Sequence, residues 1–159
     1  MRPAHWMLLL SSLMFLASLW FVLAGASAAP AGSARAAPVA TVKQLMDGLI
    51  SPASATVYGS VSIVVSAEGE KENYPKSEAE WDRVAGAAAA LAEAGSLLMA
   101  EGRARDEDRW NSISQSMIDA SVVSMKAAQA RDKDALLASG EALNNSCDDC
   151  HRIYSVDVE

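Results

Sequence analysis

The chain has 159 residues, which is enough for one folded domain, and 20 acids against 13 bases give it a formal net charge of −7. Because a negative chain repels phosphate, this balance argues against nucleic-acid binding. The charge suits either a basic protein partner or plain solubility.

The first 28 residues predict a secretory signal peptide. Arg2 and His5 form a weakly basic start, residues 6–23 are almost wholly apolar, and Ala26-Ser27-Ala28 offers the small residues that signal peptidase requires. The apolar run is also close to the minimum that spans a bilayer, so an uncleaved membrane anchor is the alternative. We expect cleavage and export to the periplasm, with membrane association only if the segment is retained.

Residues 29–40 are mostly alanine, proline, glycine and serine without periodicity, and they predict a flexible leader. The folded domain is expected to cover residues 41–159. Its first helix is predicted over residues 42–65, where apolar residues recur at three- and four-residue steps. Pro52 predicts a bend near residues 49–51. Although residues 57–65 favour strand by composition, no partner strand is evident, so we predict helix there and a loop over residues 66–76.

Three further helices follow. Ser77 and Glu80 form a capping box at the start of the second helix, and Gly102 fits its end. The third is expected to begin within residues 106–108, and Asp132 is a candidate cap for the fourth. The side chains expected on the buried faces of the second and third helices are Trp81, Val84, Ala88, Leu91, Gly95, Leu98, Trp110, Ile113, Met117, Ser121 and Met125. On the fourth helix, one stripe is formed by Leu136, Gly140, Leu143, Cys147, Cys150, His151 and Tyr154. Four amphipathic helices with mostly short connections predict an all-α protein, an antiparallel four-helix bundle whose core is a usual place for a cofactor.

The two cysteines belong to the sequence Cys147-Asp148-Asp149-Cys150-His151, the C-x-x-C-H pattern of c-type haem attachment. The two thiols add to the haem vinyl groups as thioethers, and the following histidine binds iron. On a helix these three residues lie at i, i+3 and i+4, so they share one face. His151 is the only histidine left after signal removal. The alternatives are a strained local disulfide, a thioredoxin-like redox pair, which would be expected near a βαβ pattern that is not visible, and an accidental motif in a haem-free bundle.

With this motif on the last of four helices, residues 41–154 resemble the class II cytochromes c, which comprise cytochrome c prime and its low-spin relatives. The Leu45-Met46 pair, the tryptophans that start the middle helices, and the spacing from Gly140 through the haem motif to Tyr154 carry the resemblance. The resemblance implies one covalent haem c per chain near the C-terminus, and a possible homodimer built largely on the first two helices. Pro52 and the first interhelical loop depart from the family pattern at that interface.

The resemblance also implies that the first helix covers the face of the iron opposite His151. Met46 matches the family position that carries a ligating methionine in low-spin members and a merely packing residue in high-spin members. Tyr154 is expected to pack at the haem edge or to serve as a plain core aromatic. Three other methionines are secondary ligand candidates, and two cations are candidate partners of the haem propionates: Met99, Met117, Met125, Lys43 and Arg152.

The leading hypothesis is therefore a periplasmic monohaem cytochrome that carries single electrons to or from a redox partner protein. The alternative is a five-coordinate haem protein that binds nitric oxide or carbon monoxide. No catalytic constellation is evident, since the exported part has no second histidine and no glycine-rich phosphate loop. We therefore predict that the protein is not an enzyme.

Overall fold

The fold was obtained as a computed structural model, which describes residues 14, 20 and 38–155. The predicted signal peptide, residues 1–28, falls outside the described residues except for Met14 and Trp20, and so does most of the predicted leader. The chain divides into two units, Met1–Ala36 and Ala37–Glu159, and every element named below belongs to the second. None of the described helices is long and apolar enough to cross a membrane.

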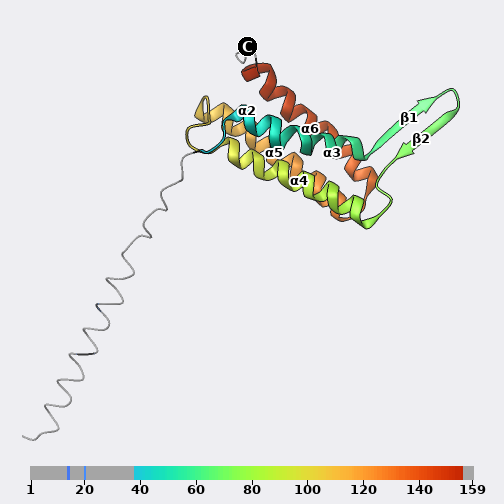
Figure 1. Cartoon of the computed structure of the whole chain (residues 1–159), viewed down its shortest axis with the longest axis horizontal. Helices are drawn as coiled ribbons and strands as arrows, with labels where there is room; N and C mark the ends of the chain where they lie inside the picture. Colours follow the sequence, from blue (N-terminus) through green and yellow to red (C-terminus); the bar gives the residue numbers. More distant parts are fainter. Residues whose placement is uncertain (1–13, 15–19, 21–37, 156–159) are drawn as a thin grey trace, which may run out of the picture. The chain divides into compact units, whose positions relative to one another are not determined.

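The second unit is mostly helical, which confirms the predicted predominance of helix. The first helical segment consists of three continuous parts, and three long helices follow it (Figure 1). In chain order these elements are α2 (Val42–Leu45), the π-helical turn η1 (Met46–Ile50), α3 (Ser51–Ser60), α4 (Glu78–Leu98), α5 (Glu107–Gln129) and α6 (Lys133–Tyr154).

The predicted bend near Pro52 takes the form of the π-helical turn η1. The backbone N–H of Ser51 donates to the carbonyl of Met46, five residues earlier, instead of to the residue four earlier. Pro52 has no N–H and occupies the first turn of α3, where a missing donor costs least. Single π turns inside α-helices often coincide with functional sites.

Residues 61–73 correct the prediction. The helix ends at Ser60, and the chain then forms a hairpin of β1 (Ser62–Ser66) and β2 (Gly69–Asn73). The strands pair antiparallel, with Ser62 opposite Asn73 and Ser66 opposite Gly69. The helix expected over residues 61–65 and the loop expected over residues 66–73 are therefore wrong, whereas residues 74–76 are loop as predicted. The β-branched run favours a strand, and Gly69 supplies the positive φ of +117° beside the two-residue turn.

The predicted helix starts are confirmed. Ser77 and Glu80 form the reciprocal capping box at the start of α4, while Asp106 and Asp132 accept backbone N–H bonds at the starts of α5 and α6. Thr41, which the sequence analysis did not single out, forms a further capping box at α2. These side chains accept hydrogen bonds from backbone N–H groups of the first helical turns, which have no acceptor within the helix.

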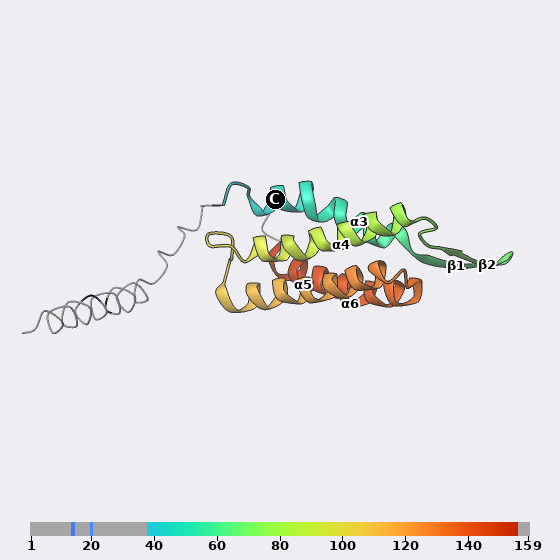
Figure 2. The same cartoon turned by 90° about the horizontal axis from the view of Figure 1, so that it is seen from below.

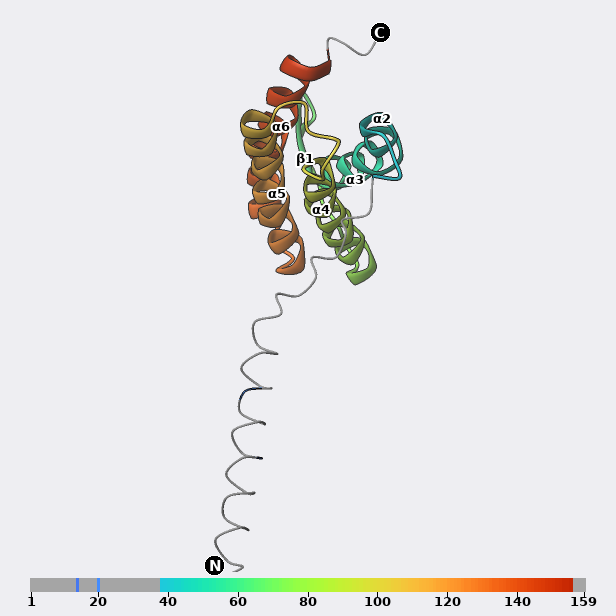
Figure 3. The ribbon, with the colours of Figure 1, turned by 90° about the vertical axis from the view of Figure 1, so that its left-hand side faces the viewer.

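The core lies where α4 packs against α5, α5 against α6, and α3 against α4 (Figures 2 and 3). All the residues expected on the buried face of α4 are buried, whereas Ile113 and Met125 on α5 are only half-buried. Leu91, Leu136 and Leu143 are the largest fully buried apolar side chains. This packing fixes the position of the C-terminal turns of α6.

Gly95 is expected to tolerate no side chain, because α4 and α5 approach closely there. A Cβ at Gly95 would lie 2.5 Å from Cγ1 of Ile118 and 3.1 Å from the Ser114 carbonyl oxygen, whereas one at Gly86, on the same helix, would meet nothing within 4 Å. We expect Gly95→Ala to lower the free energy of unfolding by about 1–3 kcal/mol through overpacking. Gly86→Ala is expected to raise it by about 0.5–1 kcal/mol through helix propensity.

Urea unfolding followed by circular dichroism measures both changes. Equal stability of the two variants would contradict the close approach of the helices.

Candidate functional site

The last turns of α6 bring together the three residues of the C-x-x-C-H pattern. Cys147 and Cys150 are half-buried free thiols, not joined in a disulfide, and the ring of His151 is exposed. The turn that carries them is closed by Ser155, whose hydroxyl and backbone N–H both donate to the His151 carbonyl. The helical spacing thus places all three side chains on the side of α6 that borders two cavities.

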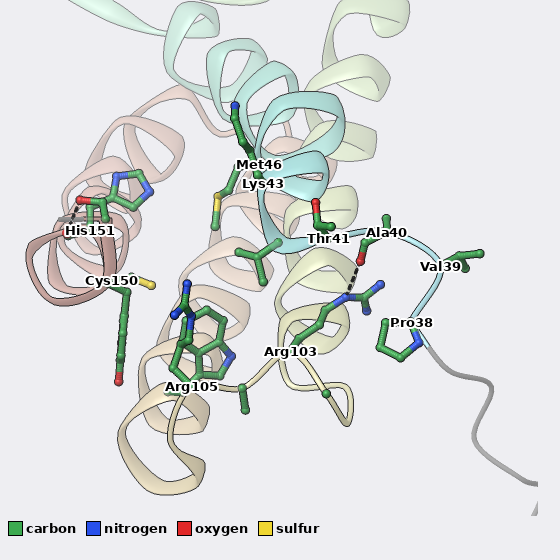
Figure 4. Close-up of a pocket in the computed structure, with 16 residues that line it drawn as sticks. Pro38, Val39, Ala40, Thr41, Lys43, Met46, Arg103, Arg105, Cys150 and His151 are labelled. Atoms are coloured by element: carbon green, nitrogen blue, oxygen red, sulfur yellow. Dashed lines mark hydrogen bonds between the residues drawn. The ribbon is translucent and has the colours of Figure 1, made fainter. Parts of the chain in front are cut away.

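The larger cavity, of about 830 Å³, lies between α6, the start of the first helical segment, and the loop that joins α4 to α5 (Figure 4). A smaller cavity of about 150 Å³ continues along α3, where Cys147, Ile50 and Tyr58 line it. Cys150 and His151 line both cavities. The larger volume falls in the range typical of small-molecule and cofactor sites.

Met46 comes from η1 and lines both cavities together with His151 (Figure 4). Its side chain is half-buried. Of the secondary methionine candidates, Met117 lines the smaller cavity, whereas Met99 and Met125 line neither. The structure therefore brings Met46 to the same site as the C-x-x-C-H residues.

The surroundings of both cysteine thiols favour their protonated form. Burial raises the pKa of Cys147 and, together with the nearby Cys147, that of Cys150. Redox-active cysteine pairs typically have one thiol whose pKa is lowered, the opposite of the shift found here. This electrostatic environment speaks against a thioredoxin-like use of the two cysteines.

Tyr58 is a site residue that the sequence analysis missed. Burial, followed by the proximity of Cys147, raises the pKa of its hydroxyl to about 12. A signal for it existed, because Met46, Ile50, Ser54 and Tyr58 recur every four residues, and all four line the smaller cavity.

Tyr154 joins the end of α6 to the start of α5. Its ring meets that of Trp110 edge-on, with centroids 4.9 Å apart. Its hydroxyl donates to Oδ2 of Asp106 at 2.5 Å, which raises the pKa of Tyr154 to about 12 and lowers that of Asp106. Trp110 is itself fixed by a 2.8 Å hydrogen bond from Nε1 to the Leu98 carbonyl. Tyr154 and Trp110 both line the larger cavity, so this aromatic pair forms a fixed part of its wall.

Of the two cations singled out in the sequence, only Lys43 lines the larger cavity. Arg152 lines neither cavity and pairs instead with Asp149 on its own helix. Arg103 and Arg105, from the loop between α4 and α5, line the larger cavity and were not predicted. Their position depends on how this loop packs against the helices, which no sequence motif indicates.

Among the described residues, no group of three or more histidine, cysteine or acidic side chains is arranged to hold a metal ion. No protein-family model, curated protein or solved structure matches the chain. The site therefore has to be interpreted from its own residues.

Proposed function

We propose that the chain is an exported monohaem c-type cytochrome that carries single electrons. One haem would be attached through Cys147 and Cys150, with His151 as the proximal iron ligand. The observation that carries the proposal is the lining of one cofactor-sized cavity by Cys150 and His151, with Cys147 one helical turn earlier.

The residues present fit such a group. Two free, half-buried thiols can supply the sulfur atoms of two thioethers, and the exposed ring of His151 is free of any hydrogen bond to the described residues. Haem iron needs only one or two protein ligands, because the porphyrin provides four nitrogens. The lack of a larger cluster of metal-binding side chains in residues 38–155 is compatible with that need. Apolar and aromatic side chains such as Met46 and Trp110 would cover the ring faces and edges.

The architecture supports the same proposal. The connections before and after α5 are short, and consecutive long helices pack against each other, as in an antiparallel four-helix bundle whose first helix is the α2–η1–α3 segment. The β1–β2 hairpin is an insertion between the first two helices of such a bundle. The site would lie between the first and the last helix.

When bound, haem supplies a one-electron redox couple. The chain's contribution would be to hold the group and to set its reduction potential through ligation and burial. The contact of Tyr154 with Asp106 and Trp110 would fix the turn that carries His151. Met46 would supply a second protein ligand to the iron, a thioether that favours electron transfer over the binding of small ligands. The protein would act in the periplasm with a redox partner protein, not as an enzyme.

The experiment is to express the full chain with an export pathway and the haem-attachment machinery. We expect a red protein whose haem survives denaturation, with the mass of one haem added and a pyridine haemochrome spectrum typical of two thioethers. The double variant Cys147→Ala/Cys150→Ala is expected to carry no covalent haem.

The control is Ser139→Ala, on the same helix and outside both cavities, which is expected to carry haem like the parent. A colourless, folded parent protein with two free thiols would overturn the proposal.

A further inference from the structure

The charged side chains that line the larger cavity all have the same sign. They are Lys43, Arg103 and Arg105, and none of the described residues that line this cavity is an aspartate or a glutamate. The chain as a whole has the opposite sign, with a formal net charge of −7. A concave wall lined by one sign of charge focuses its potential and attracts groups of the opposite sign. The cavity thus combines an apolar wall with a local attraction for anions.

Two of these cations already have partners in the fold. Nζ of Lys43 lies 2.7 Å from Oδ2 of Asp47. Arg103 donates from Nε to the Ala40 carbonyl at 3.1 Å and from Nη1 to the Leu97 carbonyl at 2.8 Å. These bonds hold the chain before α2 against the end of α4. Arg103 keeps its charge, and these two carbonyls engage two of its five N–H donors.

Arg105 is different. It makes no hydrogen bond or ion pair with any of the described residues, and its side chain extends into the cavity (Figure 4). The neighbouring acid, Asp106, is occupied: Oδ1 accepts from the backbone of α5, and Oδ2 accepts from Tyr154. Five unused donors of a planar guanidinium therefore border an apolar cavity, in the form that binds carboxylates in a bidentate manner.

We propose that Arg105 binds the carboxylate groups of a tetrapyrrole. This inference rests on the proposed function, and it assigns an orientation to the tetrapyrrole in the cavity. The three cations line only the larger cavity, whereas Cys147 lines only the smaller one and Cys150 lines both. In haem the vinyl groups and the propionates lie on opposite edges of the ring. If the vinyl edge is attached to the cysteines, the propionate edge would point toward the end of the larger cavity that the cations line.

The test uses the full chain with Cys147→Ala and Cys150→Ala, so that binding stays reversible. It is titrated with ferric haem and with ferric haem dimethyl ester, which lacks both carboxylates, while tryptophan fluorescence is recorded because Trp110 lines the cavity. We expect haem to bind more tightly than its ester. Adding Arg105→Gln should weaken haem binding about tenfold, as expected for the loss of a charge-assisted hydrogen bond, and leave ester binding unchanged.

Two variants serve as controls. Arg83→Gln removes the same charge from α4 at a position outside both cavities, and it should change neither affinity. Arg105→Lys keeps the charge without the bidentate geometry and should recover part of the lost affinity. Circular dichroism checks that each variant keeps the helical content of the parent.

The outcomes separate the two proposals. If haem and its ester bind equally tightly, or if Arg105→Gln weakens both to the same extent, the cavity takes a tetrapyrrole but Arg105 does not recognise carboxylates. If neither compound binds to the Cys147→Ala/Cys150→Ala chain although the unaltered chain carries covalent haem, this inference fails and the proposed function stands; if the unaltered chain is also colourless, both fail.

Discussion

Met46→Leu is expected to convert the haem-loaded protein from six-coordinate to five-coordinate. The reduced form should lose the sharp, split visible bands of a low-spin haem and gain a broad Soret band that shifts when carbon monoxide is added. The reduction potential should fall, because a methionine thioether opposite histidine raises it. Met46 is the residue to change because it lines both cavities together with His151 and comes from the facing helical segment.

Leucine is chosen because it keeps the volume and apolar character of methionine, which typically costs less than about 1.5 kcal/mol in stability. Met117→Leu is the matched control, since Met117 lines the smaller cavity and is buried in α5. Its spectrum should equal that of the parent. A parent protein that already binds carbon monoxide with a high-spin spectrum would contradict ligation by Met46. It would favour the gas-binding alternative.

Leu143→Ala is expected to lower the free energy of unfolding by about 2–5 kcal/mol. Leu143 is fully buried, with 0% of its surface exposed, and it lies on α6 one turn before Cys147. Its removal leaves a cavity in the core without touching the site. Because domains of this size are stable by only about 5–15 kcal/mol, the variant should unfold at a melting temperature lower by roughly 6–20 °C.

Leu137→Ala provides the comparison on the same helix, because Leu137 is 37% exposed and leaves the core intact. Its free energy of unfolding should stay close to that of the parent in urea titrations. A similar loss in both variants would show that α6 does not bury the face seen in the structure.

Elements with a local chemical signal could be predicted from the sequence. Ser77, Asp106 and Asp132 cap the helices as expected, because a capping side chain bonds to its own first turn and needs no distant partner. The common face of the C-x-x-C-H residues follows from helical spacing in the same way. The placement of Met46 beside them came from a family resemblance.

The hairpin was not predictable by the same means. β1 has a β-branched composition, but its partner β2 is the charged sequence Gly-Glu-Lys-Glu-Asn, which shows no apolar alternation. The sequence pattern of residues 69–73 therefore does not predict a partner strand. Part of its support is tertiary, since Glu72 pairs with Lys133 at the start of α6.

The cations of the site were missed for a related reason. Arg103 and Arg105 belong to a loop, and their meeting with Met46 and His151 depends on how α4, α5 and the first helical segment pack. No spacing rule connects residues from three such elements. Tyr58 shares the four-residue row of Met46, but its contact with Cys147 again depends on the packing of α3 near α6.

Because of the π turn before Pro52, the direction in which the Met46 side chain points depends on the number of residues in that turn. A turn closed from Ser51 to Met46 contains one residue more than an α turn. One residue corresponds to about 100° of rotation about a helix axis. The buried side chains of Ala53 and Val57 fix α3 against α4. The extra residue in the turn therefore determines which way the side chains of α2 and of Met46 point relative to α6. A one-residue deletion in this turn would therefore re-aim the methionine sulfur without altering any side chain that lines the site.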